Sequence, residues 1–155
     1  MADVKDLEPY ASNAEGLTSV LTDIVSTMPN PIVFKVVGYV VNTFEDVTQG
    51  DVLYARASDG LVGKAIANDT LDKAVVAGIA ETTVTAGNQV RVIVTGQVAV
   101  STSLDPGDMY FLSASSAGGL TKTPPSSAGQ YLTLVGEAGT SNQIVLKIKR
   151  PIQLR

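Results

Sequence analysis

Hydrophobic positions near the start of the chain follow a helical period. Between Asn13 and Met28 they recur at spacings of three and four, which places them on one face of an α-helix. Ser12 and Glu15 have the spacing of a capping box, and two prolines stop the pattern after Met28. We therefore predict an N-terminal arm and amphipathic helix over residues 1–31, which either covers the β core or docks on a partner. The apolar stripe comprises Leu17, Val20, Leu21, Ile24, Val25 and Met28.

From Ile32 onward the pattern becomes that of strands. Short runs rich in Val, Ile, Tyr and Ala are separated by Gly, Asn, Asp and Pro, the residues that favour turns. No helical period of useful length follows Pro31. The pattern predicts an all-β fold, an antiparallel barrel or sandwich. The expected strands are 32–41, 52–57, 61–67, 73–81, 89–94, 97–100, 109–113, 130–137 and 143–149.

Several short motifs occur twice in the same order. A chance origin for such a series is improbable, so we predict a tandem duplication, with copy one at 32–95 and copy two at 96–150. The copies and a tail at 151–155 form one β domain, 32–155, in which the halves pack about a pseudo-two-fold axis. The matched residues are Gly38 with Gly96, Gly50-Asp51 with Gly107-Asp108, Gly60-Leu61 with Gly119-Leu120, Gly78 with Gly136, and Asn88 with Asn142.

The repeated glycines and aspartates have a structural explanation. Glycine before a strand suits a turn with positive φ, and glycine inside a strand indicates a bulge or a close backbone approach. The alternative for Asp51 and Asp108 is a pair of ligands for a hard cation such as Ca²⁺ across the pseudo-axis. Such a site needs more oxygen ligands than the sequence brings together. The prediction is therefore no catalytic, cofactor-binding or metal residue.

Composition narrows the chemistry available to the chain. It contains no Cys, His or Trp, which removes disulfides, thiolate nucleophiles, the usual base near neutral pH and the preferred ligands of zinc. Two converging carboxylates could still support hydrolysis, but the acidic residues are spread singly through the sequence. We predict that the protein is not an enzyme and needs no cofactor.

Charge and hydropathy bear on partners. The net charge is −4, and no basic cluster exceeds Lys147, Lys149 and Arg150, so we expect no nucleic-acid partner. No apolar run reaches the length of a membrane span, and the N-terminus has no apolar signal core. These patterns predict a soluble protein made in the cytosol.

Two segments of the second half are expected to lie outside the core. Residues 113–129 are small, polar and proline-bearing, which predicts a long exposed hairpin excursion. Pro151 leads out of the last strand, so residues 151–155 are expected to form an extended tail at an edge or on a neighbouring subunit.

One set of motifs in residues 96–151 resembles virion proteins of tailed bacteriophages, especially small capsid decoration (cement) proteins and fibre modules. The first copy shows the resemblance more weakly, and the N-terminal helix has no place in it. The resemblance implies a small β protein that oligomerises on a capsid or fibre. The residues that carry it are Gly107-Asp108-Met109-Tyr110-Phe111-Leu112-Ser113, Gly119-Leu120-Thr121, Pro124-Pro125, Gly129-Gln130-Tyr131 and Val135-Gly136-Glu137-Ala138.

Two functions follow from this resemblance. The first is a cement protein on the outer surface of a phage head, a homotrimer bound to the major capsid protein, located in the virion after synthesis in the host cytoplasm. The alternative is a tail-fibre or receptor-binding module. A fibre tip that binds carbohydrate usually exposes aromatic rings that stack on the sugars. A third class, a β-structured hydrolase, is disfavoured because this chain offers no nucleophile or base for it. Cement is favoured because several aromatics lie inside expected strands: Phe34, Tyr39, Tyr54, Tyr110 and Phe111.

Overall fold

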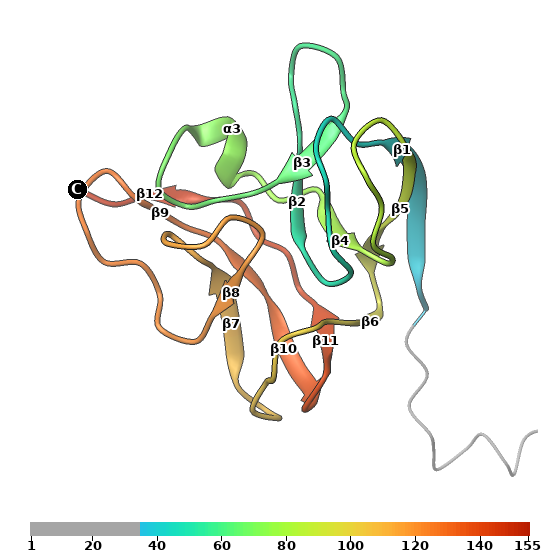
Figure 1. The fold of residues 1–155 in the computed structure, drawn as a ribbon. Helices are drawn as coiled ribbons and strands as arrows, with labels where there is room; N and C mark the ends of the chain where they lie inside the picture. Colours follow the sequence, from blue (N-terminus) through green and yellow to red (C-terminus); the bar gives the residue numbers. More distant parts are fainter. Residues whose placement is uncertain (1–34) are drawn as a thin grey trace, which may run out of the picture. The chain divides into compact units, whose positions relative to one another are not determined.

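The computed structural model describes residues 35–155, and the predicted arm and helix at 1–31 lie outside the described residues. The regular secondary structure of the described part is almost all antiparallel β-strand, joined by turns and loops (Figure 1). The first sheet has the order β1-β5-β4-β2-β3, with strands β1 (Val37–Asn42), β2 (Val52–Ala55), β3 (Val62–Lys64), β4 (Gly78–Ala80) and β5 (Gln89–Thr95). The all-β prediction is confirmed.

A second sheet follows with the corresponding strand order, β6-β11-β10-β7-β8. Its strands pair antiparallel, as those of the first sheet do. The remaining strands, β9 (Tyr131–Leu132) and β12 (Ile152–Gln153), form a separate pair. The strands of the second sheet are β6 (Gln97–Ala99), β7 (Met109–Leu112), β8 (Leu120–Thr121), β10 (Leu134–Thr140) and β11 (Gln143–Leu146).

Two of the matched glycine pairs occupy like positions in the two sheets, and two do not: Gly38 lies inside β1 whereas Gly96 precedes β6 with a φ of 103°, and Gly60 has a φ of 77° whereas the φ of Gly119 is not positive. Gly50 and Gly107 have φ of 91° and 90°, and their N–H groups donate to the carbonyls of Ala80 at 2.9 Å and Ala138 at 2.8 Å. Such positive φ values favour glycine. Gly78 pairs with Leu53, and Gly136 pairs with Tyr110. A β-carbon on either strand glycine would meet the backbone carbonyl of the neighbouring strand, at Ile93 and Val145 respectively.

The main hydrophobic core draws side chains from both sheets. In β2, Val52 and Tyr54 belong to it, whereas Leu53 faces a second, smaller cluster on the opposite side of the first sheet. This is the alternation expected of a strand buried on both faces. The members contributed by the second sheet and its connections are Val98, Val100, Leu104, Tyr110, Leu112, Tyr131, Val135, Ala138, Ile144 and Leu146.

Hydrogen bonds also join the two halves. Ala67, in the segment after β3, makes two backbone hydrogen bonds to the second half. Its N–H donates to the carbonyl of Ser113, and its carbonyl accepts from the N–H of Tyr131, each at 2.9 Å. The buried hydroxyl of Thr133 donates to the carbonyl of Ala74 at 3.0 Å. Because these groups lie away from water, their pairing is needed to avoid a desolvation cost.

Two strand predictions are wrong in detail. The first residues of the predicted strand 73–81 belong instead to the helix α3 (Leu71–Ala74), and only β4 within this run is a strand. The single helical turn is held by a hydrogen bond from the Val75 N–H to the Leu71 carbonyl at 3.1 Å and by an ion pair between Lys73 and Asp69 at 2.6 Å. Four residues are too few to show a helical period. The run 130–137 is broken between β9 and β10 at Thr133, whose side chain turns into the protein to reach α3.

The excursion of the second half is mostly exposed, as expected, but parts of it pack against the rest of the chain. The excursion at 113–129 begins with Ser113, which is buried, and contains Gly118, whose N–H donates to Ala65 at 2.7 Å. The tail does lie at an edge, but its partner is the chain's own β9. Residues 152–153 therefore have a ladder partner within the chain. None of the helices within residues 35–155 is both long and apolar enough to cross a bilayer.

Candidate functional site

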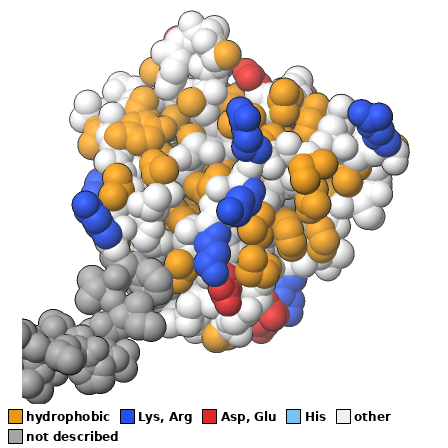
Figure 2. All heavy atoms as spheres, turned by 180° about the vertical axis from the view of Figure 1, so that it is seen from behind, with side chains coloured by type: hydrophobic (Ala, Val, Ile, Leu, Met, Phe, Trp, Pro, Cys, Tyr) orange, Lys and Arg blue, Asp and Glu red, His pale blue; other side chains and the backbone are white. Residues whose placement is uncertain are grey.

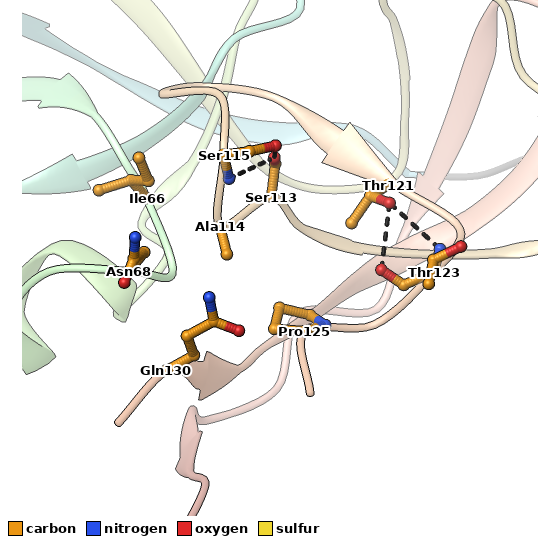
Figure 3. A pocket seen from close by; sticks show the side chains of 9 residues that line it. All are labelled: Ile66, Asn68, Ser113, Ala114, Ser115, Thr121, Thr123, Pro125 and Gln130. Atoms are coloured by element: carbon orange, nitrogen blue, oxygen red, sulfur yellow. Dashed lines mark hydrogen bonds between the residues drawn. The ribbon is translucent and has the colours of Figure 1, made fainter. Parts of the chain in front are cut away.

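A polar pocket of about 470 Å³ lies between the segment after β3 and the β7–β8 region (Figure 3). Hydroxyl and amide groups dominate its lining, and no lining side chain is charged. The pocket can therefore offer neutral hydrogen-bond donors and acceptors, but no general acid or base. The lining residues are Ile66, Asn68, Ser113, Ala114, Ser115, Thr121, Thr123, Pro125 and Gln130.

Several of these polar groups already bond within the chain. The hydroxyl of Ser113 accepts from the N–H of Ser115 at 3.1 Å, and the hydroxyl of Thr121 accepts from the N–H of Thr123 at 3.1 Å (Figure 3). The side-chain oxygen Oε1 of Gln130 accepts from the Ser127 N–H at 3.1 Å. The amides of Asn68 and Gln130 point into the space between the walls. No pattern in the sequence indicated this pocket, because its two walls come from residues 66–68 and residues 113–130, which are more than forty residues apart in the chain.

A smaller hollow of about 250 Å³ contains Asp51. Its carboxylate accepts from the N–H of Thr48 at 2.8 Å, the turn contact expected of an aspartate at this position. Burial raises the pKa of Asp51 above its usual value, an effect enlarged by Glu45 and opposed by the Thr48 hydrogen bond and Lys64. Gly118 lies close to this carboxylate across the hollow.

Asp108 has different surroundings from Asp51. Lys122 contacts both Asp108, at 3.1 Å, and Asp105. Hydrogen bonds to Asp105 and Asp108 raise the pKa of Lys122. Between residues 35 and 155 no three His, Cys, Asp or Glu side chains are gathered closely enough to hold a metal ion. Asp51 and Asp108 thus act in two separate loops, and the structure offers no support for the cation-site alternative.

We expect Asp51→Asn to be more stable than the parent near neutral pH. Because the fold raises the pKa of Asp51 from 3.8, the folded chain holds the proton more tightly, and ionisation destabilises the fold. The destabilisation is absent at pH values below the pKa of Asp51 in the unfolded chain, near 4, and grows as the pH rises through the higher pKa of Asp51 in the folded chain. The gain should stay below about 1 kcal/mol, since the group is half exposed. Melting temperatures measured across pH check this, and a pH-independent difference contradicts it.

The third hollow is an apolar groove of about 610 Å³. It combines the chain before β4, the end of β5, the starts of β7 and β10, and the chain that follows β11. Two lysines and one threonine are its only polar lining residues, and no acid lines it. We call it the apolar groove, and its lining is Val76, Ala77, Val94, Thr95, Met109, Leu134, Leu146, Lys147, Ile148 and Lys149.

The outer edge of the first sheet is a further exposed apolar surface. Within residues 35–155, β1 has β5 as its only ladder partner. Val37, Tyr39 and Val40 on this strand are 43%, 41% and 58% exposed. The exposure of Tyr39 differs from the expectation that strand aromatics are covered. The strand contains neither a charge nor a proline, the usual protections of an edge, so it can accept another strand.

Neither of these apolar surfaces was identified in the sequence. The strand 32–41 was expected, but which strands become edges depends on the order in the sheet. Comparison with known proteins adds no assignment: no family model and no curated protein matches this chain.

Proposed function

We propose that the chain is a non-catalytic virion structural protein that decorates the outer surface of a phage head and stabilises it. The observation that carries this proposal is the position, in the fold, of the motif in residues 96–151 that resembles phage virion proteins: its residues build turns and core. Gly107 bonds to the carbonyl of Ala138 at the base of a turn, Tyr110 and Leu112 are buried in the main core, and Gly136 packs against β11. A motif that builds a scaffold suits a protein that acts by binding.

A tandem duplication is part of the proposal. The like strand orders of the two sheets and the like settings of Gly78 and Gly136 support descent from one unit. We propose that the halves pack about a pseudo-two-fold axis, as a barrel or a sandwich. A core shared between them means that neither half buries its apolar face alone.

The proposed partner is the major capsid protein, and the proposed form is a homotrimer in the virion, reached after synthesis in the host cytoplasm. Shell lattices have local three-fold points where capsomers meet. A closed ring placed there contacts several capsomers at once, so individually weak contacts add through effective concentration. No nucleic acid or membrane takes part in this proposal.

Particles that lack the protein are expected to rupture at a lower temperature than complete particles. A ligand that binds only the assembled shell stabilises it by mass action, by about 2.7 kcal/mol per site at a hundredfold excess over Kd. The fraction of intact particles is measured on heating, and purified protein added back should restore it. Equal rupture temperatures with and without the protein would contradict the cement function.

The polar pocket favours a second candidate, the fibre or receptor-binding module. Its hydroxyls and amides suit a neutral, hydroxyl-rich ligand such as a sugar, with the amide of Asn68 and the amide nitrogen of Gln130 as the available groups. In that case Asn68→Ala and Gln130→Ala particles lose adsorption to host cells and keep their heat stability. For a cement protein the same variants leave adsorption unchanged.

A further inference from the structure

The apolar groove is large, exposed and positively charged at its rim. Met109 in its wall is 39% exposed. Lys147 pairs with Glu137 at 2.6 Å, whereas Lys149 has no ion-pair partner among residues 35–155. Figure 2 shows one face of the molecule, on which groups of hydrophobic side chains are separated by Lys and Arg side chains with a few Asp and Glu side chains beside them. A surface of this kind suits an amphipathic segment with an apolar stripe and negative charge.

The chain itself contains such a segment. Residues 1–34 hold five acids and one lysine, so they carry the whole net charge of −4, while the ten acids and ten bases of residues 35–155 cancel. Residues 13–28 combine the helical apolar stripe with Glu15 and Asp23. A helix of this length would span about 24 Å, so its apolar stripe would run over about four turns.

We propose that the apolar groove receives residues 13–28 of a neighbouring copy of the chain, an inference that rests on the proposed homo-oligomer and names its interface. The groove and the segment are different surfaces, so the contact is heterologous, the kind that closes a ring of three. Two identical patches facing each other would give a dimer instead. Pro29 and Pro31 favour an extended backbone after the segment, which suits a segment that reaches a neighbour.

Cysteine cross-linking tests the interface directly, because the parent chain has no cysteine. One full-length chain carries Val25→Cys and a second, of different mass through a tag, carries Met109→Cys. Mixing under mild oxidation should give a covalent heterodimer, since only cysteines held close can bridge. The matched control replaces Met109→Cys with Leu71→Cys, on α3 and 54% exposed. The groove pair should form on the order of tenfold more heterodimer than the control.

Charge exchange provides an independent readout. Lys149→Glu is expected to weaken the oligomer measured by sedimentation, and adding Asp23→Lys to the same chain should restore it, because both partners then reverse sign. Arg155→Glu is the matched control and should leave the oligomer unchanged. A loss in the control equal to that of Lys149→Glu would indicate a general charge effect and contradict the assignment.

Three outcomes separate this inference from the proposed function. Heterodimer no more abundant than in the Leu71→Cys control overturns the groove as the interface, while an oligomer that still stabilises particles leaves the cement function standing. A chain with both cysteines that gives only monomers with an internal disulfide overturns the exchange between copies. A parent protein that is monomeric both in solution and on particles overturns the homo-oligomer together with this inference.

Discussion

Gly78→Ala and Gly136→Ala are each expected to destabilise the fold by about 3 kcal/mol, through forced overpacking. An alanine β-carbon at Gly78 would overlap the carbonyl of Ile93, and one at Gly136 would overlap the carbonyl of Val145. These carbonyls belong to backbone that cannot rotate aside, so adjacent strands must separate. For a domain of this size the loss corresponds to about 10 °C in Tm, measured by thermal unfolding. Valine at either position should cost more.

Gly139→Ala on the same strand as Gly136 is the matched control. Its β-carbon would lie 3.2 Å from the side-chain Nε2 of Gln97, which donates to the Oε1 of Gln143 at 2.7 Å. This contact is with the end of a flexible side chain, so relief costs at most an adjustment of one neutral hydrogen bond and no movement of backbone. We expect a change below about 1 kcal/mol for this variant. If Gly136→Ala melted as Gly139→Ala does, the close strand approach at Gly136 would be disproved.

Leu112→Ala should destabilise both sheets together by about 3 kcal/mol, the typical cost of a cavity in a closed core. Leu112 is fully buried and belongs to the cluster that also contains Val52, Ile79 and Ile93 of the first sheet. Because the two sheets share this core, the loss should propagate to the first sheet. Chemical denaturation gives the free energy of unfolding, and hydrogen exchange of amides in β4 and β5 shows whether protection there falls equally.

The control for this prediction is Leu71→Ala on α3, where the side chain is 54% exposed. Truncation there should change stability by about 0.5 kcal/mol or less. Faster exchange confined to the second sheet in Leu112→Ala would mean that the halves unfold separately, contrary to a single cooperative domain.

The strands that follow a strict alternation could be predicted closely. Residues 89–94 were expected as a strand, and β5 runs from Gln89 to Thr95. Turn chemistry was also readable, because the positive φ at Gly50 and Gly107 is a local requirement. Local periodicity failed where an element is only one turn long, as in α3, or where a buried contact interrupts a run, as at Thr133.

The candidate sites could not be predicted in the same way. The apolar groove joins Val76, Val94, Met109, Leu134 and Ile148, which are neighbours only after the two sheets share a core. The polar pocket likewise unites Asn68 with Gln130. Proximity between such distant residues depends on strand order and sheet packing, and neither leaves a local pattern in the chain.

The sequence by itself determined the all-β class, the positions of the main turns and the segregation of charge, because each depends on residue type and short-range periodicity. Only the tertiary structure decided that β1 is an exposed edge, that the tail pairs with β9, and that Asp51 and Asp108 have different partners, Thr48 for the first and Lys122 for the second. These features follow from long-range pairing, in which each strand selects its neighbour by burying apolar surface and satisfying backbone hydrogen bonds across the whole domain.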